Sequence, residues 1–276
     1  MKPRLTLLAA LLLAVVAPAA DKPNIITILV DDMGFSDLGC YGSEIPTPHL
    51  DALAQGGVRF TQFYNTGRCC PTRASLLTGL YAHQAGVGHM TDDKGVPGYR
   101  GRLNENCVTL AEVLKPAGYF TIMSGKWHVG QNLGVTPWGR GFDRSLNPAA
   151  GGFYYGDSPR YDLSLNGEKI EANDPRLPKD WYSTDLWTIF GVSQRGIIAS
   201  KWAKSPRPQA VQPWSEVPAE EKERFDHLMA VYAATVFRMD QAVGDLVAGL
   251  KQRGVFENTL ILFMCDNGGN SEAGPK

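Results

Sequence analysis

Two continuous apolar runs constrain the fold of this 276-residue chain more than any other feature. They cover Asn24–Val30 (NIITILV) near the start and Thr259–Cys265 (TLILFMC) near the end. Strands without polar alternation are typical of a parallel sheet whose two faces are both covered. Helical segments lie between the two runs, so we predict an α/β fold with a mainly parallel mixed sheet sandwiched by helices.

Helix start and stop signals divide the chain between these strands. Residues 47–57 open with Thr-Pro and close with Gly-Gly, which predicts a helix with the threonine as its N-cap. A proline opens a second helix at 71–78, and a capping box opens a third at 109–115, followed by a strand at 119–124. Apolar residues that step by three or four predict a long amphipathic helix over 219–250.

Residues 151–218 are rich in Gly, Pro, Asp and aromatic residues and show no sustained period. This composition predicts a loop or lid, longer than compact domains usually tolerate. Its aromatic side chains can stack on sugar or aryl rings, and ordinary anchoring of the loop is the alternative interpretation. These aromatic residues are Phe153, Tyr154, Tyr155, Trp181 and Tyr182.

The N-terminus and the charge indicate an exported protein without a polyanionic partner. Residues 1–20 combine a basic start, a short apolar core and a small-residue end, which predicts a signal peptide and a secreted or periplasmic location. The alternative, a membrane anchor, needs about 20 apolar residues. A net charge of −1 argues against nucleic acid or an acidic membrane as partner, and we expect no membrane association after signal cleavage. Five cysteines leave at least one unpaired within the chain.

Both apolar runs end in oxygen-bearing side chains. Asp31 and Asp32 follow the first, and Asp266 and Asn267 follow the second. Ligands gather beyond the carboxyl ends of parallel strands, so these oxygens are expected to converge on a hard cation, calcium or magnesium. Asp and Asn are also common turn formers after strands, which is the alternative interpretation.

The run Cys69-Cys70-Pro71-Thr72-Arg73 carries the second chemical signal. Pro71 in a first helical turn puts Cys69 at or just before a helix N-terminus, where free N–H groups favour an anion. Arg73 adds a cation able to grip an oxyanion at two points. A structural cysteine before a helix is the alternative.

Cys-x-Pro-x-Arg followed by Leu-Thr-Gly resembles the signature of the formylglycine-dependent, arylsulfatase-like sulfatases of the alkaline phosphatase superfamily. The register selects Cys69, because only Cys69 has proline two places on and arginine four places on. Three further motifs match the family in order: Asp31-Asp32-Met33-Gly34, Ser124-Gly125-Lys126-Trp127-His128 and Asp266-Asn267-Gly268-Gly269.

The resemblance implies a site and a chemistry. Cys69 would be oxidised to formylglycine by a formylglycine-generating or sulfatase-maturing enzyme. One hydroxyl of the aldehyde hydrate attacks sulfur and expels the alcohol, and the other loses its proton as the aldehyde reforms and sulfate leaves. The resemblance assigns Arg73 to holding the hydrate and metal ligands, Lys126 to contacting sulfate, and His128 to assisting the second hydroxyl. One calcium ion would be held by Asp31, Asp32, residue 69, Asp266 and Asn267.

The chain also departs from the family pattern. No Ala-Pro-His-like segment precedes the long helix, since Trp187–Gln194 leads into Pro-rich sequence, and this predicts an internal deletion. The family continues beyond Asp-Asn-Gly-Gly into a sulfate-binding lysine and a smaller C-terminal domain. We therefore expect residues 21–276 to be a partial N-terminal catalytic domain. Each lost contact to a developing oxyanion costs on the order of a hundredfold in rate.

The resulting functional expectation is hydrolysis of an aryl sulfate or a sulfated carbohydrate. Two alternatives stay open at this point. One is a phosphodiesterase or phosphonate hydrolase of the same superfamily, and the other is a truncated pseudoenzyme without catalysis.

Overall fold

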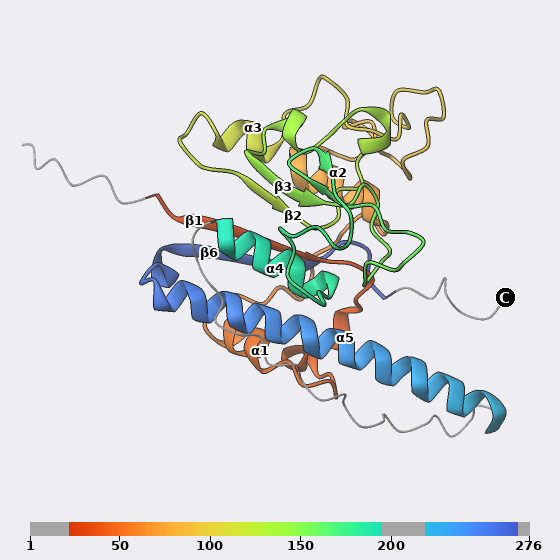
Figure 1. The fold of residues 1–276 in the computed structure, drawn as a ribbon, viewed down its shortest axis with the longest axis vertical. Helices are drawn as coiled ribbons and strands as arrows, with labels where there is room; N and C mark the ends of the chain where they lie inside the picture. The colour runs from red at the N-terminus through yellow and green to blue at the C-terminus, as the bar shows by residue number, and fades with distance from the viewer. Residues whose placement is uncertain (1–21, 195–218, 270–276) are drawn as a thin grey trace, which may run out of the picture.

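The structure is a computed structural model that describes residues 22–194 and 219–269 (Figure 1). The predicted signal peptide at 1–20 and most of the Pro-rich stretch, 195–218, lie outside the described residues. Among the helices that the structure describes, none combines the length and apolarity that a membrane span requires.

The two apolar runs form the strands predicted for them, β1 (Asn24–Val30) and β6 (Thr259–Cys265). They pair in parallel along their whole length, from Asn24 beside Thr259 to Val30 beside Cys265. The remaining described strands form a second, four-stranded sheet, parallel between its first two strands and antiparallel beyond. In order they are β2 (Ile122–Ser124), β3 (Arg144–Asn147), β4 (Ser164–Leu165) and β5 (Glu168–Lys169). The α/β class is confirmed, with the described strands divided between two sheets.

Helices lie on both sides of the β1–β6 pair (Figure 1). The long helix α5 (Ala219–Gln252) and α1 (Pro48–Gln55) pack against one side, where Val236 and Met239 meet Ile28 and Phe263. On the other side are α2 (Cys69–Thr78) and α3 (Leu110–Leu114), while α4 (Ser183–Gln194) contacts β2 and α5. Single 3-10 turns occupy Phe35–Asp37, Gly39–Tyr41, Gln131–Leu133, Trp138–Arg140 and Phe256–Asn258.

Thr47 occupies the N-cap position of α1 as predicted, but a residue distant in sequence supplies the capping hydrogen bonds. The Thr47 side chain makes no capping hydrogen bond. The buried carboxylate of Asp240, on α5, instead accepts the backbone N–H groups of His49 and Leu50 at 3.2 and 2.8 Å. A carboxylate satisfies two free donors there and complements the helix dipole, which also fastens α1 to α5. The capping box of Thr109 with Glu112 on α3 is confirmed.

The loop prediction for residues 151–218 holds for most of 151–182, but it misses the β4–β5 hairpin and the helix α4. β4 and β5 form a hairpin around Asn166 and Gly167, whose φ angles are +51° and +92°. Two successive positive φ angles are what a tight two-residue hairpin turn requires. The stretch Trp187–Gln194, interpreted above as leading into the Pro-rich sequence, belongs to α4. That helix is tied to α5 by Arg238, which reaches both carboxylate oxygens of Asp185 at 2.8 and 2.7 Å.

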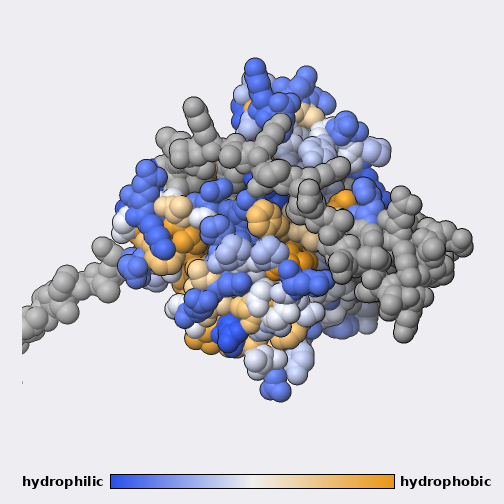
Figure 2. Space-filling view, turned by 90° about the horizontal axis from the view of Figure 1, so that it is seen from below, coloured by the Kyte–Doolittle hydropathy of each residue, from blue (hydrophilic) through white to orange (hydrophobic). Residues whose placement is uncertain are grey.

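Part of the apolar surface stays exposed. On the face drawn in Figure 2, hydrophobic residues gather in small patches between hydrophilic ones. Across the described residues, Val58, Phe60, Phe63 and Tyr64 are 58–84% exposed in the segment before α2. No third strand pairs with β1 or β6 among the described residues.

Candidate active site

The carboxyl ends of β1 and β6 bring the two predicted oxygen-bearing pairs together. Because the strands pair in register, the backbone N–H of Asp266 donates to the carbonyl of Val30 at 3.0 Å. Beyond them, the Asn267 amide donates to Asp32 Oδ1 at 2.7 Å. The Asp31 carboxylate is near enough to Asp266 for each to act on the other's pKa. Four side chains predicted from two distant motifs therefore share one edge.

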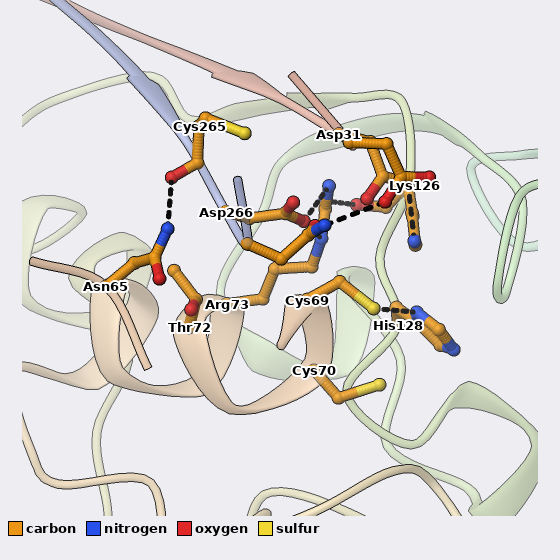
Figure 3. A network of polar contacts seen from close by, with 12 residues as sticks. Asp31, Asn65, Cys69, Cys70, Thr72, Arg73, Lys126, His128, Cys265 and Asp266 are labelled. Atoms are coloured by element: carbon orange, nitrogen blue, oxygen red, sulfur yellow. Dashed lines mark hydrogen bonds and ion pairs between the residues drawn. The ribbon is translucent and has the colours of Figure 1, made fainter. Parts of the chain in front are cut away.

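Arg73 ties the helix that carries the cysteine motif to this edge (Figure 3). The side chain is buried, and its Nε and Nη2 both lie 2.7 Å from Asp266 Oδ2. Its Nη1 donates to the backbone carbonyl of Lys126 at 2.5 Å. The local interpretation of Arg73 as a grip for a substrate oxyanion is therefore replaced by one in which it positions Asp266 and the Lys126 segment.

The charges and unpaired oxygens at the strand ends fit the binding of a divalent cation. Burial and the neighbouring Asp31 carboxylate raise the pKa of Asp266 to about 7, although Arg73 opposes the rise. Both Asp266 Oδ1 and Asn267 Oδ1 are buried, and neither has a hydrogen-bond partner among the described residues. Unpaired buried oxygens next to clustered carboxylates are costly without a counter-ion, and oxygen ligands suit calcium or magnesium. The donor set thus fits the predicted metal ligands.

Lys126 extends the site from the segment after β2. Its ammonium nitrogen lies 2.6 Å from Asp31 Oδ2, and its side chain is 16% exposed. Burial opposes ionisation of Asp31, but the charge and hydrogen bond of Lys126 outweigh it and lower the pKa of that carboxyl. Lys126 is therefore held beside Asp31 at the carboxyl ends of β1 and β6.

Cys69 is the first residue of α2 and is half-buried, with Sγ 3.4 Å from His128 Nδ1. The two cysteine sulfurs and a ring nitrogen of His128 lie within 4.8 Å of one another. A hydrogen bond from Cys70 lowers the pKa of Cys69 to about 3 against the effect of burial, with further help from His128 and Lys126. Cys70 keeps its proton, and its pKa is raised by the bond to Cys69. The site therefore stabilises negative charge at the γ atom of residue 69.

Two predicted site residues adopt backbone conformations that side-chain-bearing residues rarely take. Asp32 has φ +59° and His128 has φ +56°. Such left-handed geometry costs on the order of 1–3 kcal/mol when neighbours impose it, and it concentrates at functional sites. Both residues flank the same edge, which supports a constrained, preorganised arrangement.

The sequence alone did not predict the polar residues that support the start of α2 and the end of β6. Thr72 Oγ1 lies 2.9 Å from Thr66 Oγ1 and accepts the Thr66 backbone N–H at 3.1 Å. The Asn65 amide donates to the carbonyl of Cys265 at 3.3 Å. Asn65 and Thr66 stand a few residues before Cys69, and this closeness to the cysteine motif was the available signal. The histidines outside the motifs are all exposed: His49, His83, His89 and His227.

Comparison with known proteins gives this arrangement a family. The sulfatase family model matches residues 23–194 and 199–276. Arylsulfatase of Klebsiella aerogenes is 31% identical over 94% of this chain and 68% of that protein. Human arylsulfatase A is 35% identical over 94% of this chain and 55% of that protein. The solved structure of Ps i-CgsB in complex with k-i-k-neocarrahexaose has a TM-score of 0.72 and 28% identity, covering 92% of this chain and 60% of that one.

By these matches the chain resembles the sulfuric ester hydrolases. The chain belongs to the sulfatase family. It spans 68% and 55% of the two arylsulfatases and 60% of Ps i-CgsB. The alignment with the Klebsiella protein has 323 positions, more than the 276 residues of this chain, so that relative carries residues with no counterpart here. An internal deletion would have this effect.

Proposed function

We propose that this chain hydrolyses sulfate esters with residue 69 as the nucleophile, after oxidation of Cys69 to formylglycine. The observation that carries the proposal is the position of Cys69 at the start of α2, 3.4 Å from His128, where its pKa falls to about 3. Surroundings that stabilise a thiolate would also stabilise charge on an oxygen nucleophile. Formylglycine supplies two hydroxyls on one carbon, one to attack sulfur and one whose deprotonation releases sulfate.

One calcium ion is the cation that we propose for the strand ends, held by Asp31, Asp32, Asp266, Asn267 and residue 69. The buried, unpartnered oxygens of Asp266 and Asn267 support this assignment. The raised pKa of Asp266 supports it as well, because a divalent ion would neutralise the crowded carboxylates. Such an ion would lower the pKa of a bound hydroxyl and offset the charge of sulfate.

Arg73, Lys126 and His128 take the remaining roles in the proposed reaction. Arg73 holds Asp266 and the carbonyl of Lys126 in place and acts as a positioning residue. Lys126, already at the edge beside Asp31, offers its ammonium group to a sulfate oxygen. His128 lies within reach of the γ position of residue 69 and takes or returns a proton there.

The proposed substrate class rests on a solved structure, and the proposed location rests on the N-terminal sequence. Ps i-CgsB binds k-i-k-neocarrahexaose, which supports a sulfated glycan or a small sulfated molecule as the substrate here. The apolar N-terminal stretch supports export to the periplasm or the medium, where a formylglycine-generating or sulfatase-maturing enzyme would be the maturation partner.

Mass spectrometry and substrate comparison together test the proposal. The peptide containing residue 69, isolated from protein made in the native host, should show formylglycine in place of cysteine. The same preparation should hydrolyse 4-nitrophenyl sulfate faster than bis(4-nitrophenyl) phosphate, and Cys69→Ala should be inactive. An unmodified thiol in that peptide, or a preference for the phosphodiester, would overturn the proposal. A modified residue 69 with bound calcium but no turnover would mark the chain as a pseudoenzyme.

A further inference from the structure

The segment that follows β3 leaves the candidate active site and carries two tyrosines to the surface beside it. The backbone N–H of His128 donates to the carbonyl of Ala149 at 2.8 Å, so the segment begins in direct contact with the site. At Gly151, where φ is +81°, an added Cβ would meet the side chain of Lys126 at 3.4 Å. Tyr154 is three residues further along, within about 11 Å of backbone reach.

The aromatic residues of this region divide into two groups. Phe153 and Trp181 are 5% and 8% exposed and lie in the core beside α4, so for them the anchoring interpretation is correct. Tyr154 and Tyr155 are each 57% exposed. Tyr182 is half-buried, and its ring centroid is 5.7 Å from that of Tyr154, nearly parallel at 13°, and 5.5 Å from that of Tyr155. These three rings are called the tyrosine platform below.

The tyrosine platform is exposed, but backbone and ring contacts hold it in place. The backbone N–H of Ser183 donates to the carbonyl of Tyr154 at 2.9 Å, and Phe153 anchors the adjoining chain in the core. Ring contacts with Tyr182 restrict both exposed tyrosines, so little freedom remains to be lost when a ligand binds. A tyrosine ring joins an apolar face to a polar hydroxyl, and a pyranose ring likewise has an apolar C–H face and a hydroxyl rim.

Charge around the tyrosine platform links it to the site. Burial, Asp32 and Asp31 raise the pKa of Tyr154, which puts its ring within electrostatic range of the strand ends. On the other side, an added Cβ at Gly152 would lie 3.6 Å from Arg160 Nη1. Arg160 is exposed, and its guanidinium makes no ion pair with any of the residues that the structure describes. A cation next to exposed rings suits a ligand that carries further negative charge.

We infer that the tyrosine platform is the subsite for the sugar ring that bears the sulfate ester. The inference rests on the sulfatase function proposed above and narrows its substrate class to sulfated carbohydrates. The sulfate would lie toward Lys126 and residue 69, and the ring would stack on Tyr154 and Tyr155. Arg160 would favour saccharides with a second anionic substituent.

Steady-state kinetics on a panel of methyl hexoside monosulfates tests the inference, with inorganic sulfate as a competitive inhibitor that has no ring. Tyr154→Ala and Tyr155→Ala should each raise KM for the best hexoside about tenfold. The inhibition constant of inorganic sulfate, which reports the anion pocket alone, should change less than about twofold. Tyr81→Ala is the matched control, because Tyr81 is 80% exposed on the loop after α2. It should change neither constant.

The outcomes separate this inference from the proposed function. If 4-nitrophenyl sulfate is hydrolysed but no sulfated hexoside binds, the function stands and the subsite is wrong. Equal changes in KM and in the inhibition constant would mean a general disturbance of the pocket and would also overturn the subsite. If no ester is hydrolysed at all, calorimetric titration with the hexoside monosulfates still shows whether the tyrosine platform binds a sulfated sugar. Binding that Tyr154→Ala weakens about tenfold supports the platform, and binding that it leaves unchanged overturns it.

Discussion

The buried carboxyl of Asp266 offers the most direct test of whether the strand ends hold a divalent cation. Its pKa is raised to about 7 by burial and by the adjacent Asp31. An ordinary aspartate has a pKa of about 3.9. A carboxyl whose folded-state pKa is raised contributes stability below the unfolded pKa, and that contribution is lost as the pH rises through the folded pKa. The metal-free protein should therefore lose stability between about pH 4 and pH 7.

The size of the effect follows from the same two values. A difference of about 3 pKa units corresponds to about 4 kcal/mol of unfolding free energy across that window. Calcium should restore this stability by neutralising the carboxylates, but protons compete with it. At pH 5.5 a group with a pKa of about 7 is ionised in about 3% of molecules, so calcium should bind about 30-fold more weakly than at pH 8.

Thermal unfolding followed by circular dichroism, with EDTA or with calcium at pH 5.5 and pH 8, measures both effects. In the parent protein, calcium should raise the midpoint far more at pH 8. Asp266→Asn should abolish the calcium effect and flatten the pH dependence, whereas Asp157→Asn, on an exposed loop, should preserve both. Equal stabilisation at the two pH values, or an undiminished calcium effect in Asp266→Asn, would refute the reasoning.

Three further substitutions probe the site and the scaffold. Cys69→Ala should abolish hydrolysis of 4-nitrophenyl sulfate, because residue 69 is the proposed nucleophile. Arg73→Lys keeps the charge but loses the forked contact to Asp266, so kcat/KM should fall about a hundredfold with the circular dichroism spectrum unchanged. Asp240→Ala removes the cap of α1 and should lower the unfolding free energy by about 1–3 kcal/mol in urea titrations, with kcat unaltered.

The sequence predicts most where a signal is local and strong. β1 and β6 were predicted to the residue, because apolar runs bounded by polar residues leave little room for another boundary. The long helix was predicted to within two residues of its end at Gln252. The β4–β5 hairpin was missed although Asn166-Gly167, a strong short-range turn signal, stands at its centre. The cap that Asp240 provides for α1 could not be predicted, since its partners are about 190 residues away.

For the site as well, the sequence predicted which residues take part better than it predicted what each one contacts. The motifs predicted which side chains would meet, but local physics assigned Arg73 to a substrate oxyanion. In the fold, its nitrogens join three segments: the helix that carries Cys69, Asp266 after β6, and the carbonyl of Lys126. The family resemblance had already assigned Arg73 to the metal ligands, but its contact with the Lys126 carbonyl could be found only in the fold, because the two segments are distant in sequence. A single guanidinium thus couples the helix that carries Cys69, the carboxyl end of β6 and the Lys126 segment. Any deletion or substitution that moves one of these segments should therefore disturb the other two.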